Sequence, residues 1–193
     1  MLRSLEWVAH PALAGAAFCL LSLGVVTWLP ALAALASALQ GWRRDGDSRC
    51  FTAVLAAFPG YWRLLWRHAV VSTAALAALA AVVAFLAGRP EPVAIPLLAV
   101  QVGGLAAFVV YHLALAVVAG HDTAVAEPGC RRVQALVFAF GSVGRSLALL
   151  AAAVLAPVLT LPLAVGPLLL GPSLAVLCGL ILLERTASLG PRR

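Results

Sequence analysis

The chain has 193 residues, of which 64% are hydrophobic and only 10% charged, and its mean hydropathy is +1.06. A soluble domain carries about 25% charged residues, so this composition excludes a soluble monomer and indicates a protein that lies in lipid. The net charge of +6 comes from arginines that lie between apolar runs, with no lysine in the chain. Such placement is typical of cytoplasmic loops and lipid headgroups, and it argues for a lipid bilayer and against nucleic acid as a partner.

The first apolar run extends over 12–39 and is predicted to be the first membrane span. It is longer than the apolar region of a signal peptide, about 7–15 residues. The residues before it are barely basic, because Arg3 is offset by Glu6. We therefore expect an uncleaved span. Pro30 lies inside the run and is expected to kink it or to end a helical piece there.

An aromatic and basic segment, 51–67, follows the first polar loop and is predicted to lie along the membrane surface. Its apolar residues recur at spacings of three and four, which places them on one helical face: Leu55, Phe58, Trp62 and Trp66. Aromatic rings beside arginines are typical of the headgroup level. The predicted anchors are Trp62, Arg63, Trp66 and Arg67. A nucleic-acid stacking platform is the alternative, but it needs a water-facing groove. Pro59 is expected to start a fresh helix.

Two spans are predicted at 68–87 and 95–119, and they are joined by a short turn of sequence GRPEP. Each run is about long enough to cross the hydrocarbon core, so together they should form an antiparallel hairpin. A second interfacial segment is predicted at 133–146. It ends near Arg145, which we take as a further anchor because it directly precedes an apolar run.

The last apolar stretch, 147–183, contains four prolines. As one straight helix it would be roughly 55 Å long, which far exceeds a core of ~30 Å. We therefore expect two spans, 147–164 and 168–183, that turn near Val165-Gly166-Pro167. A broken or re-entrant element remains the alternative. These elements predict an all-α, polytopic helical bundle of about five spans that forms a single membrane domain, 1–193.

Arginine placement predicts the orientation of these spans in the cell membrane. Eleven of the thirteen arginines lie in the loops 40–68 and 120–146 and in the tail 184–193, whereas Arg3 and Arg89 lie on the opposite side. An excess of positive charge marks cytoplasmic loops. The prediction is a multi-pass protein with its N-terminus outside and its C-terminus in the cytoplasm.

One ionisable side chain lies deep in a predicted span. His112 shares a helical stripe with Gln101, Gly104 and Phe108, and an intramembrane histidine suggests a ligand contact or a proton relay. Gln101 and His112 are therefore the candidate residues of a substrate pathway. In the alternative interpretation they hydrogen-bond a neighbouring helix, while Gly103 and Gly104 permit close helix approach.

Nothing in the sequence points to an enzyme. The predicted spans contain no Asp or Glu, and no nucleotide-binding, zinc-protease or serine-hydrolase motif is present. His121 and Asp122 stand together without a third ligand or a nucleophile nearby. The four cysteines are scattered rather than clustered, and metal sites need clustered ligands. We expect no catalytic residue, no metal and no cofactor.

Four short motifs resemble the YesL-like family of bacterial integral membrane proteins, a domain of unknown function. They are WLPALAAL at 28–35, FxxYWRLLWRHAV at 58–70, VVYHLALA at 109–116 and GRSL at 144–147. Leu29 and Ala31 flank Pro30 where family members often carry a glycine and a threonine. The resemblance implies an accessory role in carbohydrate uptake, and it assigns no catalytic or binding residue.

Three functional hypotheses follow. The first is a non-enzymatic accessory component of carbohydrate uptake that packs against sugar-transporter subunits. The second is a small dimeric transporter or channel whose pathway is lined by Gln101, His112 and the proline-broken region 157–172. The third is a membrane scaffold or sensor that uses its cytoplasmic arginine loops.

Overall fold

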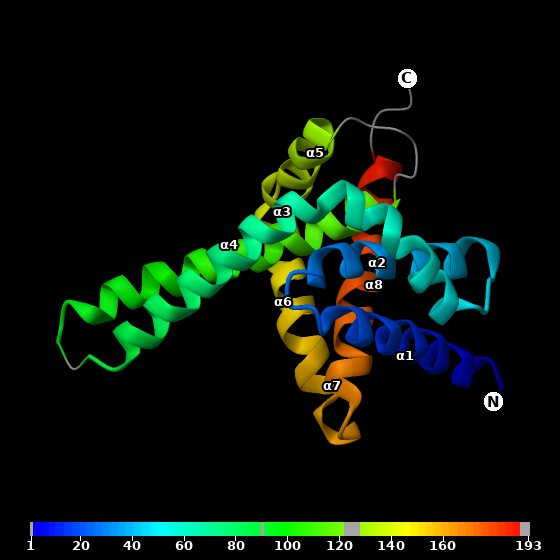
Figure 1. The fold of residues 1–193 in the computed structure, drawn as a ribbon, viewed down its shortest axis with the longest axis horizontal. Helices are drawn as coiled ribbons and strands as arrows, with labels where there is room; N and C mark the ends of the chain where they lie inside the picture. The colour runs from blue at the N-terminus through cyan, green and yellow to red at the C-terminus, as the bar shows by residue number, and fades with distance from the viewer. Residues whose placement is uncertain (1, 90, 122–127, 190–193) are drawn as a thin grey trace.

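The computed structural model describes residues 2–89, 91–121 and 128–189, and every regular element in these ranges is a helix (Figure 1). The predicted all-α fold is therefore confirmed. In chain order the elements are α1 Leu2–Ser22, α2 Trp28–Asp45, α3 Cys50–Ala87, α4 Ala94–His121, α5 Pro128–Phe140, α6 Val143–Leu159, the 3-10 helix η1 Leu161–Leu163, α7 Gly166–Leu169 and α8 Gly171–Leu189. Asp122 and the C-terminal residues 190–193 lie outside the described residues.

Several helices are long and apolar enough to cross a membrane, which indicates an integral membrane protein. Within the described residues there are three of them: Cys50–Ala87, Ala94–His121 and Gly166–Thr186. A fourth crossing is added if Gly129–Phe140 and Val143–Leu159, which meet at a bend of 93°, form one span. About 20 residues are needed to cross the hydrocarbon core. By length and composition alone, the described part has three helices that could cross a membrane, or four with the bent pair, which supports the helical bundle and leaves the number of about five spans a prediction.

The run 12–39 is two helices and not one. α1 ends at Ser22, α2 begins at Trp28, and the turn between them includes Val25 at a φ of 52°. The Thr27 hydroxyl donates to the Leu21 carbonyl across this turn. Pro30 is the third residue of α2, where its missing N–H is tolerated because the first turn has no intrahelical acceptor for it.

α1 and α2 form an antiparallel hairpin. The Trp7 ring, near the start of α1, lies 4.9 Å from the Trp42 ring, near the end of α2, in an edge-on arrangement. His10 also lies against Trp42, at 5.6 Å between ring centroids. The expectation of a single crossing over 12–39 is therefore replaced by a helix that goes out and a helix that returns.

The predicted interfacial segment 51–67 and the span 68–87 form one continuous helix, α3. At ~1.5 Å per residue its 38 residues have an axial length of about 57 Å, which is longer than a hydrocarbon core of ~30 Å. Pro59 lies inside this helix instead of starting one. It removes one backbone hydrogen bond, to the carbonyl of Leu55, a residue that is 38% exposed rather than sealed in the core.

The second predicted interfacial segment, 133–146, is divided by the bend between α5 and α6. Ser142 has an extended backbone there, with φ −154° and ψ 129°. A Cβ added at Gly141 would lie 2.4 Å from the Val137 carbonyl oxygen, so only glycine fits this close turn. Further on, the region 147–183 turns where it was expected to: α6 ends at 159, and α8 begins at 171 after the short helices η1 and α7.

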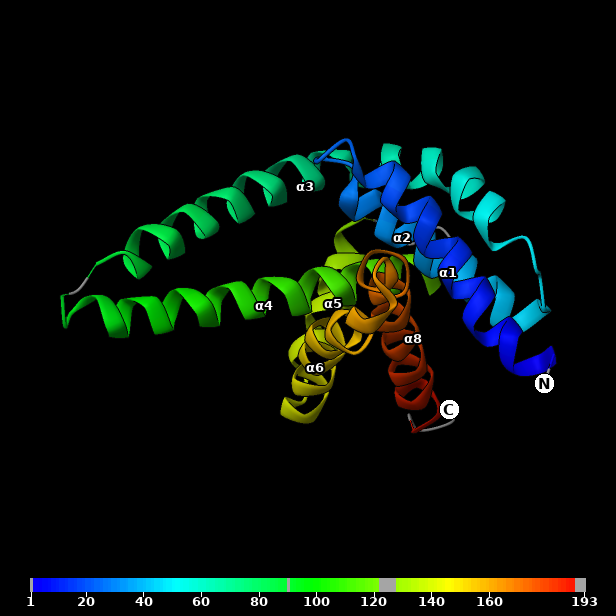
Figure 2. The ribbon, with the colours of Figure 1, turned by 90° about the horizontal axis from the view of Figure 1, so that it is seen from below.

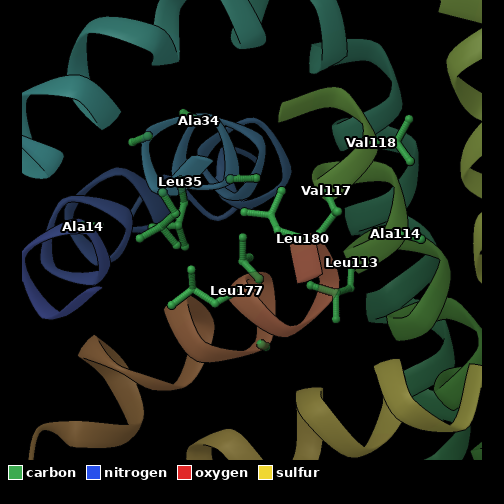
Figure 3. Packing of buried hydrophobic residues seen from close by; sticks show 14 of the residues in the cluster. Ala14, Ala34, Leu35, Leu113, Ala114, Val117, Val118, Leu177 and Leu180 are labelled. Atoms are coloured by element: carbon green, nitrogen blue, oxygen red, sulfur yellow. The ribbon is translucent and has the colours of Figure 1, made fainter. Parts of the chain in front are cut away.

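The core forms where α2 meets α4 and α8. Figure 3 shows Leu35 of α2, Val117 of α4 and Leu180 of α8 converging from three helices, and all three are fully buried. Ten of the 18 residues of α2 are buried, a larger share than the eleven of 28 in α4, so we call α2 the central helix. α6 and α8 run side by side and cross the α3–α4 hairpin steeply (Figures 1 and 2).

The outer part of the α3–α4 hairpin extends away from the other helices as a long arm (Figures 1 and 2). We define the arm as residues 77–89 and 91–107. Its large apolar side chains are exposed, among them Phe85 at 60%, Ile95 at 72% and Val100 at 70%. Such a surface is stable in lipid, where exposure of apolar residues carries no hydrophobic penalty.

Candidate functional site: the His112 junction and its cavity

His112 of α4 is the centre of a buried polar cluster. Its side chain is 4% exposed, and its Nε2 atom lies 2.7 Å from the Ser72 hydroxyl of α3. Its Nδ1 atom lies 2.8 Å from the Phe108 carbonyl oxygen. Because a carbonyl only accepts, Nδ1 carries a proton and donates, and in the neutral ring Nε2 accepts from Ser72. Both nitrogens are therefore engaged within the protein.

Aromatic rings surround His112 and bring a third helix into the cluster. The ring centroids of Phe108, Tyr111, Trp28 and His68 lie 3.9, 4.9, 5.4 and 5.5 Å from that of His112. Trp28 of α2 also donates its Nε1 hydrogen to the Thr73 hydroxyl of α3 at 3.0 Å. We call the set Trp28, His68, Ser72, Thr73, Phe108, Tyr111 and His112 the His112 junction. It joins α2, α3 and α4.

His68 is the member of the junction with unused hydrogen-bonding capacity. Its ring stacks on that of His112 at an interplanar angle of 20°, and its Nε2 atom is buried without a hydrogen-bond partner among the described residues. No group of three His, Cys, Asp or Glu side chains that could hold a metal occurs in the described residues. The two histidines form a stacked imidazole pair.

An apolar cavity of about 260 Å³ adjoins the junction. Trp28 and His112 supply its polar side chains, and both already have partners inside the protein. The remaining lining is apolar and comes from six helices: Leu32, Leu76, Phe108, Val109, Leu113, Ala153, Pro157, Pro167, Gly171, Pro172 and Ala175. Such a lining suits an apolar ligand group, because no unpaired polar atom of these two side chains is available to a hydrophilic one.

The fold brings only part of the predicted pathway together. His112 lines the same cavity as Pro157, Pro167 and Pro172, so the histidine and the proline-broken region are neighbours. Gln101 does not line this cavity. It lies eleven residues before His112, roughly 16 Å along the helix axis, within the arm.

The predicted anchors of α3 form an aromatic and basic surface. Trp62 stacks on Phe58 with ring centroids 6.2 Å apart, and the Arg67 guanidinium lies 5.4 Å from the Trp66 ring. Trp66 is 43% exposed, and Arg63 is also exposed. Cation–π pairs of this kind are worth about 0.5–1 kcal/mol at exposed sites. The surface has the chemistry of a headgroup contact.

Arg145, the fifth predicted anchor, folds back onto α5. Its Nη2 atom donates to the Val137 carbonyl at 3.3 Å, and its guanidinium lies 5.7 Å from the Phe138 ring. Val137 lies in the last turn of α5, and its carbonyl oxygen also accepts a hydrogen bond from the Gly141 N–H at 2.9 Å. Arg145 thus stabilises the bend between α5 and α6.

Sequence reasoning missed a second polar cluster at the end of α2. Arg43 forms two hydrogen bonds to the Glu184 carboxylate of α8, at 3.1 and 2.9 Å. Beside it, Arg44 lies 3.1 Å from His121 Nε2. Gln40, in the amide orientation that matches its neighbours, donates to the Gly120 carbonyl at 3.1 Å. These partners are far apart in the chain, so the sequence does not pair them. The one signal of this cluster in the sequence is Glu184, a lone acidic residue near the end of an apolar run.

The variant Arg43→Gln is expected to lower the free energy of unfolding by about 1 kcal/mol, because it breaks a two-point ion pair whose side chains are only 21% and 35% exposed. Glu184→Gln should lower the free energy of unfolding by a similar amount. The double variant should lower it by little more than either single variant does. Unfolding of the purified protein in detergent measures this. Arg89→Gln is the control, since its contact with Glu91 is 3.8 Å long and 49% and 68% exposed. Equal losses in Arg43→Gln and Arg89→Gln would contradict the assignment.

Comparison with known proteins adds no relative from which a role for the His112 junction could be transferred. The junction and its cavity are therefore interpreted from their geometry. No protein-family model matches the sequence, and neither a curated protein nor a solved structure matches it.

Proposed function

We propose that this protein is a non-catalytic membrane subunit that packs against another membrane protein through the arm of α3 and α4. The observation that carries this proposal is the open space beside two glycines of α4. Gly103 and Gly104 are exposed, and a Cβ added at either would meet no atom within 4 Å. Among the described helices of this chain, none packs against these two glycines.

Glycines inside membrane helices usually serve close packing. Gly103 and Ala107 lie four residues apart and are both exposed, which forms the small-xxx-small pattern that lets two helix backbones approach. A glycine costs a helix about 1 kcal/mol relative to alanine. By contrast, Gly120 of the same helix already packs against α2 of this chain. The pattern at 103–107 leaves room for a helix of a different protein.

The contacts of the His112 junction support a role of the buried polar side chains in holding helices together. Ser72 bonds His112 and Thr73 bonds Trp28, so these four side chains hold α2, α3 and α4 together. Interhelical polar contacts of this kind typically contribute about 0.6–2 kcal/mol in membranes. The resemblance to the YesL-like family suggests the partner class, a permease subunit of a sugar transporter. A second copy of this chain is the other partner that the test distinguishes.

The double variant Gly103→Leu with Gly104→Leu is expected to reduce recovery of the partner by roughly tenfold, because two leucine side chains would occupy the space that a partner helix needs. The measurement is affinity purification from membranes in mild detergent after crosslinking, with quantification of what copurifies. The double variant should keep its fold, because the added side-chain atoms meet open space.

Gly60→Leu is the matched control, because Gly60 of α3 also borders open space but lies outside the arm. It should leave recovery unchanged. A sugar-transporter permease in the wild-type sample would support the accessory role, whereas a second copy of this chain would assign the arm to self-association. Recovery of the wild-type protein alone and monomeric would overturn the proposal.

A second candidate function is transport by a dimer of this chain itself, and one observation favours it. His112 and the prolines of the broken region line a common cavity, and discontinuous helices often form transporter sites near the middle of the bilayer. Flux across reconstituted vesicles that is lost in His112→Ala, while assembly stays normal, would favour transport over the accessory role.

A further inference from the structure

Gln101 of α4 is a polar side chain that the His112 junction does not use. In the helical parts of the arm, 77–87 and 94–107, it is the one side chain with hydrogen-bonding groups, since all the others are Ala, Val, Leu, Ile, Phe, Pro or Gly. A hydrocarbon core takes about 20 residues of a helix. In α4, which has 28 residues, a core centred on the helix includes position 101. The arm therefore carries one polar group on a surface that is otherwise apolar.

The amide of Gln101 has no hydrogen-bond partner among the described residues. The part of α3 that belongs to the arm, 77–87, contains no polar side chain that could bond it. A primary amide offers two N–H donors and a carbonyl acceptor, and leaving these groups unpaired in an apolar environment is costly. The side chain is partly exposed, so a neighbouring protein can supply the hydrogen bond that this chain does not.

Gln101 lies at one edge of the open surface beside the two glycines. At about 100° per residue, it is offset by about 60° from Gly104 and by about 120° from Ala107. Gly104 is exposed, and a Cβ added there would meet open space. Residues three apart are neighbours on a helix. A helix that packs on Gly104 would therefore approach closely enough for one of its side chains to reach the Gln101 amide.

A symmetric pair of arms does not provide the missing hydrogen bond. In a two-fold pair of parallel helices, a residue at one edge of the contact faces the opposite edge of the other helix and not its own copy. On α4 the edge opposite to Gln101 is formed by Ala99 and Ala106, whose side chains have no hydrogen-bonding group. A different protein is therefore the better source of a partner for the amide.

We propose that the arm binds a membrane helix of another protein that places a hydrogen-bonding side chain, such as Ser, Thr, Asn, Gln or His, against Gln101. This inference rests on the proposed function and adds the chemistry of the partner. The glycines allow close approach to many apolar helices. The amide makes the contact selective, because a purely apolar helix would cover it without bonding it.

The test compares Gln101→Met with the wild type in the affinity purification after crosslinking. Methionine has a similar length and volume but does not replace the amide's donors and acceptor. Recovery of the partner should therefore fall by roughly three- to tenfold. Unchanged recovery in Gln101→Met would overturn the inference.

Val102→Met is the matched control, because it introduces the same side chain at the next position. Val102 is 50% exposed and lies about 160° around the helix from Gly104, so recovery should stay unchanged. If Gly103→Leu with Gly104→Leu abolishes recovery while Gln101→Met does not, the proposed function stands and only this inference fails. Recovery of no partner by the wild type would overturn both.

A second measurement keeps Gln101 in place and identifies the partner segment directly. A photoreactive phenylalanine analogue is introduced at Leu97, which is 50% exposed and lies one turn before Gln101. It should capture a membrane helix of another protein that has a hydrogen-bonding side chain within about one turn of the crosslink. Capture of a helix with only apolar side chains nearby would overturn the inference, and so would capture of a second copy of this chain.

Discussion

Gly120→Ala is expected to lower the free energy of unfolding by about 3 kcal/mol, the upper end of typical overpacking costs. The added Cβ would lie 2.6 Å from the Ala36 Cβ, 2.7 Å from the Ser37 backbone nitrogen and 3.0 Å from the Ala33 carbonyl oxygen. Two of these three atoms belong to the backbone of α2, the central helix, so no flexible side chain can move aside. The effect is measured by unfolding the protein in detergent, with the loss of the monodisperse peak on heating as the signal.

Gly103→Ala is the control for this prediction because it makes the same chemical change on the same helix. Its Cβ would meet open space, so alanine should stabilise α4 by about 0.5–1 kcal/mol through its better helix propensity. The two variants should thus shift stability in opposite directions. Shifts of the same sign and size would show that α2 and α4 do not pack as closely as described.

His112→Ala is expected to lower the free energy of unfolding by about 2–4 kcal/mol. The change removes the bond to Ser72, leaves that hydroxyl buried without its partner, and opens a cavity among the surrounding rings. Ser72→Ala removes only the hydrogen bond and should cost about 1 kcal/mol. Unfolding of the same detergent-solubilised samples gives both values.

The double variant of Ser72 and His112 tests whether the two side chains act together. Once His112 is alanine, replacing Ser72 should cost almost nothing, because the bond is already lost. If the losses of unfolding free energy in the two single variants added up in the double variant, this result would contradict the hydrogen bond between Ser72 and His112. The same stability values are also needed to interpret transport, since a loss of flux in an unfolded variant says nothing about a pathway.

The helical class and the α3–α4 hairpin could be predicted from the sequence because their signals are local. A long apolar run without charges predicts a helix in lipid, and the Gly and Pro residues of 88–92 predict a turn. The break at 23–27 could not be predicted in this way. Its residues are mostly as apolar as those of the helices beside it, and the hairpin is closed by the distant pair Trp7 and Trp42.

The candidate site, like the fold, could be predicted from the sequence only in part. His112 could be found because it is an ionisable group inside an apolar run, and a partner on a neighbouring helix was one of the two interpretations. Its bond to Ser72 could not be found, because the sequence does not distinguish that serine from its neighbour Thr73, the other small polar residue in 68–87. Gln101 shares a stripe with His112 in sequence, but position along the helix, and not the stripe alone, decides which residues reach a cavity.

The hairpin of α1 and α2 also affects the parity of the membrane crossings. Trp7 contacts Trp42, and Arg43 binds Glu184, so the beginning of α1, the end of α2 and the end of α8 lie together. Because α1 runs out and α2 returns, this hairpin adds either two crossings or none to those of the later helices. A single span over 12–39 would have added one crossing, so the hairpin changes the expected parity by one.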